Sequence, residues 1–143
     1  MIAVDTNILV YAHRGETPFH AVAKARVAAL AQGLEPWGIP IACLQEFLAV
    51  SSNPKLFTPA STPTQAFAQI EAWRASPSLT ILHSTERHLG VLQTIATKAH
   101  LVGGQYHDAR VAAICLEHGV TKLWTADRDF AKFKDLKSEN PLI

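Results

Sequence analysis

Short apolar runs alternate with longer helical stretches along this chain, and this alternation restricts the possible folds more than any other feature. The runs that read as strands cover residues 2–4, 37–41, 79–82 and 120–125, of which 37–41 is a strand or an extended lead-in. Helical patterns fill the intervals, at residues 6–13, 17–32, 42–52, 62–75, 84–101, 105–118 and 126–134. Strands that alternate with amphipathic helices predict an α/β fold with a mostly parallel central sheet.

Three of the expected helices begin with a recognisable signal. Thr17 and Thr62 each precede a proline, and a threonine N-cap followed by proline is a common start of a helix. Ser84, with Glu86 behind it, opens the helix expected up to about residue 101. Gly33 follows the alanine-rich stretch and is expected to end it.

Length and composition indicate one folded domain over residues 1–143. Hydrophobic residues make up 48% and charged residues 17% of the chain, which excludes intrinsic disorder. Two cysteines, Cys43 and Cys115, are too few for a disulfide scaffold and lack the spacing of a zinc site. The first residues lack the positive segment of a signal peptide, and no apolar run approaches the about 18 residues of a membrane span. A cytoplasmic protein with reduced thiols and no membrane partner is expected.

The charge balance alone does not indicate a protein that binds nucleic acid. Thirteen lysines and arginines face twelve acidic residues, so the formal net charge is +1. Nucleic-acid-binding domains usually carry a clear excess of basic residues. If this chain acts on a polyanion, something other than its overall charge must hold that polyanion.

Two aspartates stand where apolar strands are expected to end. Asp5 directly follows the run at residues 2–4, and Asp127 follows the run at 120–125. In a parallel sheet, ligands bind in the crevice beyond the carboxyl ends of the strands. The two carboxylates are therefore expected to point into one crevice, provided that both strands run the same way.

Two further acids, Glu46 and Asp108, lie on helices that are apolar on nearly all sides. Such helices are expected to be buried, and a buried carboxylate without a partner is costly. Arg110 is not a suitable partner for Asp108, since residues two apart do not face each other on a helix. A divalent cation such as Mg²⁺ or Mn²⁺, which prefers carboxylate oxygens, would neutralise several acids at once.

Each acid also has a simpler, local interpretation. Asp5 and Asp127 stand where they could cap the segments that follow them, and Asp108 lies in the first turn of its helix, where the dipole favours a negative charge. Glu46 could pair with a distant lysine. Only the four acids taken together, two at strand ends and two on apolar helices, favour a metal site.

The same residues resemble the PIN-domain ribonucleases, and most closely the VapC-type toxins of bacterial toxin–antitoxin pairs. The similarity extends over about residues 2–134 and rests on four motifs in the family's order: IAVDTNILVYA, LQEFLAV, HDARVAAICLEHG and LWTADRDFAKF. Between residues 55 and 100 only the apolar pattern matches. No acidic position of the family's pattern is missing.

The resemblance implies a three-layer α/β/α fold and a Mg²⁺- or Mn²⁺-dependent endoribonuclease. By position, Asp5, Glu46, Asp108 and Asp127 become the catalytic, metal-holding carboxylates, and Asp129 an accessory. It also implies a homodimer and a partner antitoxin whose C-terminal tail blocks the site.

Neighbouring polar residues complete the predicted site. Asn7 and Thr125 lie beside the acids and are expected to orient them, although turn and cap roles are equally open. Basic residues after the acidic motifs are candidates to hold RNA phosphates: Arg14, Arg110 and Arg128.

Three other functions remain open from the sequence. A receiver-like signalling domain also gathers acids and Mg²⁺ at strand ends, but it needs a lysine at the end of a late strand, where this chain has Thr125. A phosphohydrolase with an aspartate nucleophile would favour a second aspartate where Asn7 stands. A catalytically inactive PIN-like module that binds RNA or protein is the third.

Overall fold

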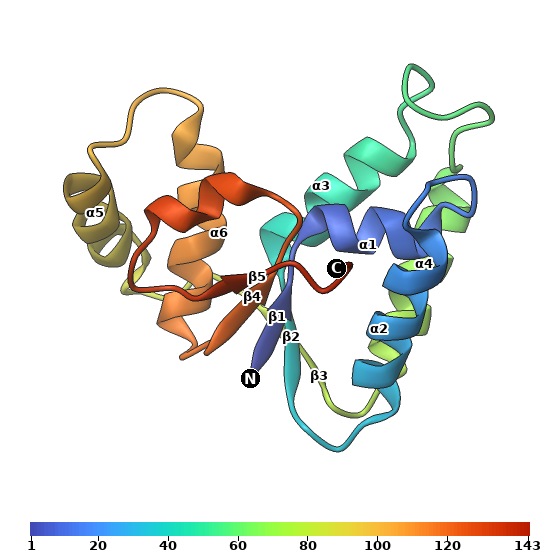
Figure 1. The fold of residues 1–143 in the computed structure, drawn as a ribbon, viewed down its shortest axis with the longest axis horizontal. Helices are drawn as coiled ribbons and strands as arrows, with labels where there is room; N and C mark the ends of the chain where they lie inside the picture. The colour runs from blue at the N-terminus through green and yellow to red at the C-terminus, as the bar shows by residue number, and fades with distance from the viewer.

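The computed structural model describes residues 1–143, and a five-stranded sheet lies at its centre (Figure 1). The strands are β1 (Ile2–Val4), β2 (Trp37–Pro40), β3 (Leu79–Leu82), β4 (Lys122–Trp124) and β5 (Ser138–Glu139), in the order β3-β2-β1-β4-β5. Every neighbouring pair is parallel, so the prediction of a mostly parallel sheet is confirmed. Strand β5 escapes the apolar pattern because both of its residues are polar.

Helices cover both faces of this sheet, as the predicted three-layer fold requires. They are α1 (Thr6–His13), α2 (His20–Gln32), α3 (Ile41–Ser51), α4 (Pro63–Arg74), α5 (His88–Ala99), α6 (Gln105–Glu117) and the 3₁₀-helix η1 (Arg128–Lys132). Figure 1 shows α5 and α6 on one side of the sheet and α1, α2 and α4 on the other. None of these helices is long and apolar enough to cross a membrane.

The helix-start signals have different outcomes. The start at Thr62 is confirmed: its Oγ1 accepts from the Gln65 N–H at 3.2 Å, and the Gln65 side chain accepts from the Thr62 N–H at 3.0 Å. The starts at Thr17 and Ser84 are wrong, since α2 begins at His20 and α5 at His88. The Thr17 hydroxyl instead donates to the carbonyl of Arg14 at 2.7 Å, which closes a turn rather than a helix. Gly33 follows the last residue of α2, as expected.

The aromatic and cysteine side chains belong to the core rather than to a site. Trp37 is fully buried, and its Nε1 donates to the Ser76 hydroxyl at 3.2 Å. Trp73 and Trp124 are also buried. Cys43 and Cys115 are fully buried, and burial raises the pKa of the Cys115 thiol to about 12, which makes it unreactive near neutral pH.

Close packing between β2 and β3 gives a test of the sheet. A Cβ added at Gly38 would lie 2.8 Å from the Leu82 Cδ1, and the Leu82 side chain is fully buried. Gly38→Ala should therefore lower the free energy of unfolding by about 1–3 kcal/mol, the usual cost of overpacking. Urea denaturation measures this change.

Gly90 provides the matched control, since it lies in α5 and a Cβ there would meet nothing within 4 Å. Gly90→Ala should leave the stability unchanged or raise it by up to about 1 kcal/mol. Equal effects of the two substitutions would contradict the packing of β2 against β3.

Candidate metal centre

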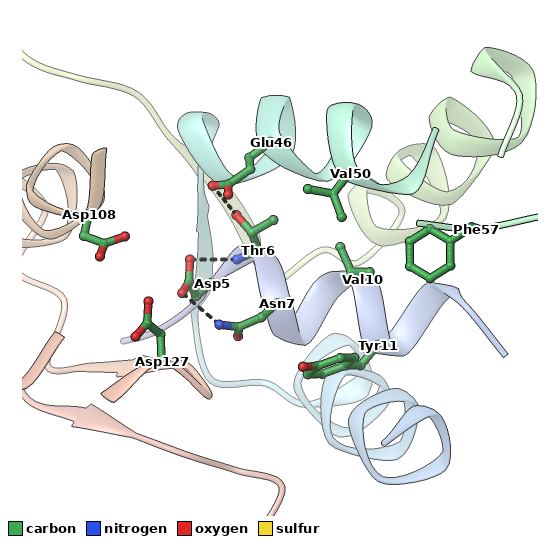
Figure 2. A pocket seen from close by; sticks show the side chains of 10 residues that line it. All are labelled: Asp5, Thr6, Asn7, Val10, Tyr11, Glu46, Val50, Phe57, Asp108 and Asp127. Carbon is green, nitrogen blue, oxygen red and sulfur yellow. Dashed lines mark hydrogen bonds between the residues drawn. The ribbon is translucent and has the colours of Figure 1, made fainter. Parts of the chain in front are cut away.

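A cavity of about 290 Å³ opens at the carboxyl ends of the central strands. Four acids from four separate segments of the chain line it: Asp5, Glu46, Asp108 and Asp127. Figure 2 shows their carboxylates turned toward a common space. The parallel arrangement explains the meeting of the first and last of these acids, because Val4 pairs with Trp124 in the register of β1 and β4.

Asp5 is the most deeply placed of the four. It connects β1 to α1, and its backbone N–H donates to the carbonyl of Trp124 at 2.9 Å. One carboxylate oxygen, Oδ1, accepts from the Thr6 N–H at 2.8 Å and so caps α1. The other, Oδ2, accepts from the Thr125 hydroxyl at 2.8 Å and from the Asn7 amide at 3.4 Å. Asp5 thus has a capping role and also lines the cavity.

Burial dominates the ionisation of Asp5, whose exposed fraction is 6%. Removal from water raises its pKa to about 6, although the hydrogen bonds from Thr125, Thr6 and Cys43 act in the opposite direction. The negative charge of Glu46 adds to the rise. Asp5 therefore lacks the positive partner that would keep its carboxylate ionised at low pH.

Asp108, Asp127 and the neighbouring Asp129 form a tighter group. A carboxylate oxygen of each lies within 4.8 Å of one from the other two. Burial, followed by the charge of Asp127, raises the pKa of Asp108, while Lys132 opposes the rise. Although Asp108 lies in the first turn of α6, the N-cap of that helix is Gly104 and no side chain caps it. Asp108 therefore does not cap α6, although the helix dipole favours a negative charge at its place in the first turn.

Asp127 has a local role as well. Its Oδ1 accepts from the Asp129 N–H at 2.8 Å and caps η1. This bond places Asp129, which is exposed, next to Asp108 and Asp127, which are half-buried. The accessory residue of the sequence prediction thus lies beside Asp108 and Asp127.

The prediction that α3 is buried on nearly all sides is wrong. Glu46 and Gln45 are exposed, because α3 packs through Leu44 and Phe47 and turns its other face toward the cavity and solvent. The Glu46 Oε2 accepts from the Thr6 hydroxyl at 3.1 Å. Glu46 therefore lies at the mouth of the cavity. Since it is exposed to water, it does not pay the cost of burial that was expected from the sequence.

Asn7 and Thr125 connect the acids to each other. The Asn7 amide also donates to the Thr125 hydroxyl oxygen at 3.3 Å, and its Oδ1 accepts from the Ala126 N–H at 3.2 Å. The Thr125 hydroxyl accepts in turn from the Asp127 N–H at 3.0 Å. This network holds the segment that carries Asp127 against the start of α1, so both residues orient acids and stabilise turns.

The three arginines predicted to rim the site are placed differently. Arg14 does not line the cavity; its guanidinium donates to the Pro59 carbonyl at 2.7 Å and to the Ser61 hydroxyl at 3.0 Å, and pairs with Glu16. Arg110 and Arg128 are exposed. Arg128 borders, together with Asp127 and Thr125, a second hollow next to the cavity. A role of Arg110 and Arg128 in holding phosphates stays a prediction.

Sequence reasoning missed two kinds of residue. Tyr11 and Phe57 line the cavity. Tyr11 lies in the first motif but is not among its polar candidates, and Phe57 belongs to a loop without any periodic pattern. Glu117 on α6 is a buried acid that takes no part in the cavity. Its carboxylate accepts from the backbone and hydroxyl of Thr85 at 2.7 Å and pairs with His88 at 2.6 Å.

The donor set of the cavity fits a divalent cation. None of the ion pairs of this structure involves Asp5, Glu46, Asp108 or Asp127. Oxygens that share one Mg²⁺ at about 2.0–2.1 Å lie within about 4.2 Å of each other, and oxygens of Asp108, Asp127 and Asp129 lie within 4.8 Å of one another. The all-oxygen set suits Mg²⁺ or Mn²⁺ better than the softer metals.

The raised pKa of Asp5 predicts how its replacement responds to pH in EDTA. Ionised Asp5 destabilises the folded state, and this penalty appears as the pH rises from about 4 to about 7. Asp5→Asn should therefore gain stability relative to the unsubstituted protein over this range, by up to about 3 kcal/mol. Urea denaturation at several pH values measures the difference. A difference that does not change with pH would contradict the buried, unpaired carboxylate.

Comparison with known proteins gives the family of the chain. Residues 2–136 match the model of the PIN domain. The chain is 37% identical to the VapC ribonuclease Mb2897 of Mycobacterium bovis over 99% of this chain and 96% of that protein, and 32% identical to the ribonuclease VapC25 of Mycobacterium tuberculosis over the full length of both.

Solved structures share the fold at lower sequence identity. The VapBC2 structure from Rickettsia felis, bound to a DNA fragment, matches 98% of both chains with a TM-score of 0.70 and 20% identity. The Mycobacterium tuberculosis toxin VapC20, described as cleaving the sarcin-ricin loop, matches 92% of this chain and 93% of its own with a TM-score of 0.65 and 18% identity. This chain belongs to the PIN domain family and, within it, to the VapC ribonucleases.

Proposed function

We propose that this chain is a divalent-metal-dependent endoribonuclease, the toxin of a VapBC-type toxin–antitoxin pair, and that residues 1–143 act as one nuclease domain. The observation that carries the proposal is the meeting of four acids from distant segments in one cavity with no basic side chain paired to them. The names of its relatives agree, since proteins up to 37% identical over nearly the full chain are called ribonucleases.

In this proposal the aspartates hold the ion. Asp108 and Asp127 are its main ligands, Asp5 and Glu46 complete the set, and Asp129 assists. Mg²⁺ or Mn²⁺ held there would polarise a phosphoryl oxygen of the RNA and lower the pKa of a water molecule for hydrolysis. The protein's own groups prepare this site: the Thr125 hydroxyl and the Asn7 amide hold the Asp5 carboxylate, and the Asp129 N–H holds that of Asp127.

The charge of the cavity explains why an ion is needed before RNA binds. The phosphodiester is itself an anion, so uncompensated carboxylates would repel it by about 4 kcal/mol per pair at 4 Å and an effective dielectric near 20. Neutralising the acids removes this barrier. Arg110 and Arg128, both exposed, are proposed to hold phosphates on either side.

Two partners follow from the proposed family role. One is a second copy of this chain, since a homodimer is expected for such toxins. The other is an antitoxin that blocks the acidic cavity, and several structures that share this fold are described as VapBC assemblies. A basic side chain of the antitoxin would be attracted by the same unpaired acids that hold the ion.

The experiment compares two substitutions of the aspartate group with one outside it. Asp108→Asn and Asp127→Asn should each lower the rate of RNA cleavage in Mn²⁺ by more than about 100-fold, since even residues that only support metal ligands are worth about 10–100-fold. Asp135→Asn is the control, because Asp135 is exposed and pairs with Lys98 at 2.9 Å. Transfer RNA and ribosomal RNA serve as substrates, and cleavage is followed on denaturing gels with and without EDTA.

Three results would contradict the proposal. Cleavage that persists in EDTA would remove the metal from the reaction. Absence of cleavage by the unsubstituted protein in Mn²⁺ would favour an inactive module that binds RNA or protein. Phosphorylation of an aspartate by a small phosphodonor, without RNA cleavage, would favour the receiver-like function.

A further inference from the structure

The cavity has an apolar end that the acids do not explain. Next to the carboxylates it is lined by Val10 and Tyr11 of α1, Val50 of α3 and Phe57 of the loop after α3. Figure 2 shows these four side chains together on the side away from Asp108 and Asp127, with the Tyr11 hydroxyl turned toward the acidic end. One cavity thus joins a group of anionic oxygens to a hydrophobic surface with two aromatic rings.

Phe57 is held in this position by contacts from outside the cavity. The Arg14 guanidinium lies 4.6 Å from the centre of the Phe57 ring and is itself held by the Pro59 carbonyl and the Ser61 hydroxyl. The Phe57 N–H donates to the Asn53 carbonyl at 3.1 Å. Arg14, predicted from the sequence to hold substrate, therefore acts in the structure as a positioning residue for this ring.

The second ring is held by the helix that carries Asp5. Tyr11 belongs to α1 and packs against Phe19 with 5.4 Å between the ring centres. Its carbonyl accepts from His20 Nδ1 at 2.9 Å, which ties the end of α1 to the start of α2. Because Asp5 caps the same helix, the distance between the ring and the acids is set by one rigid element.

We infer that the apolar end binds the nucleobase of the nucleotide beside the scissile phosphate, stacked against Phe57 with Tyr11 at its edge. The inference rests on the proposed function. A nucleotide combines a phosphate and a flat aromatic base on one ribose, so a single ligand matches both ends of this cavity. The volume of about 290 Å³ lies just below the usual range for ligand pockets, about 300–1,000 Å³, so the cavity suits a ligand no larger than one nucleotide.

Stacking on an aromatic side chain accepts every base, because every base has a π-face. The subsite is therefore expected to add affinity for RNA without reading one sequence strictly, and to prefer the larger purines.

The test measures the binding of small probes in Mn²⁺ by isothermal titration calorimetry. 5′-AMP should bind about 10-fold more tightly than ribose 5-phosphate, which has the phosphate but no base. Phe57→Leu should remove this advantage and leave the affinity for ribose 5-phosphate unchanged. Phe57→Tyr, which keeps the ring, should retain the advantage and thereby separates stacking from a disturbed loop. Phe67→Leu is the control, since Phe67 is an exposed ring on α4 outside the cavity.

The outcomes separate this inference from the proposed function. If ribose 5-phosphate does not bind in Mn²⁺, the metal-phosphate site of the proposed function fails. If it binds but 5′-AMP binds no better, or Phe57→Leu changes nothing, the base subsite fails while the nuclease stands. Tighter binding of N-acetylphenylalanine amide than of 5′-AMP would assign the apolar end to a protein side chain and overturn the inference.

Discussion

Everything in this molecule that bears on function depends on one costly arrangement: carboxylates gathered at the carboxyl edge of a parallel sheet without fixed positive partners. Asp5 shows the cost most clearly, since burial raises its pKa to about 6 despite hydrogen bonds from three neighbours. Glu117 shows that this fold can satisfy a buried acid completely, because hydrogen bonds from Thr85 and His88 outweigh the effect of burial and lower its pKa. The contrast between these two residues supports the proposal that the cavity holds a cation.

The sheet places the acids and the helices hold them. Asp5 and Asp127 meet because β1 and β4 are parallel neighbours in register, and each caps the element that follows it. Capping and metal binding, which compete as interpretations of the sequence, are compatible in the structure, because a carboxylate can accept a backbone N–H with one oxygen and face the cavity with the other. Asp108 caps nothing, but its place in the first turn of α6 is one that the helix dipole favours for a negative charge.

The sequence predicts the order of elements, the sheet and the meeting of the acids. Apolar runs indicate strands, and an aspartate that follows such a run is expected at the carboxyl end of its strand. It does not predict the exposure of Glu46, since periodicity shows that a helix is apolar but not which neighbours cover it. The role of Arg14 and the place of Phe57 depend on a loop that folds back over α1, and such long-range contacts leave no local trace. Strand β5 is not predicted either, because its two residues are polar and carry no apolar pattern.

The most direct test of this account is the titration of Mn²⁺ into the metal-free protein near pH 6, repeated in two buffers with different heats of ionisation. A cation that binds among these acids must displace the protons that a raised pKa retains, so Mn²⁺ should bind with release of protons, and less release is expected at pH 8. Binding of Mn²⁺ without proton release at pH 6, or no binding at all, would contradict the claim that these acids form a metal centre.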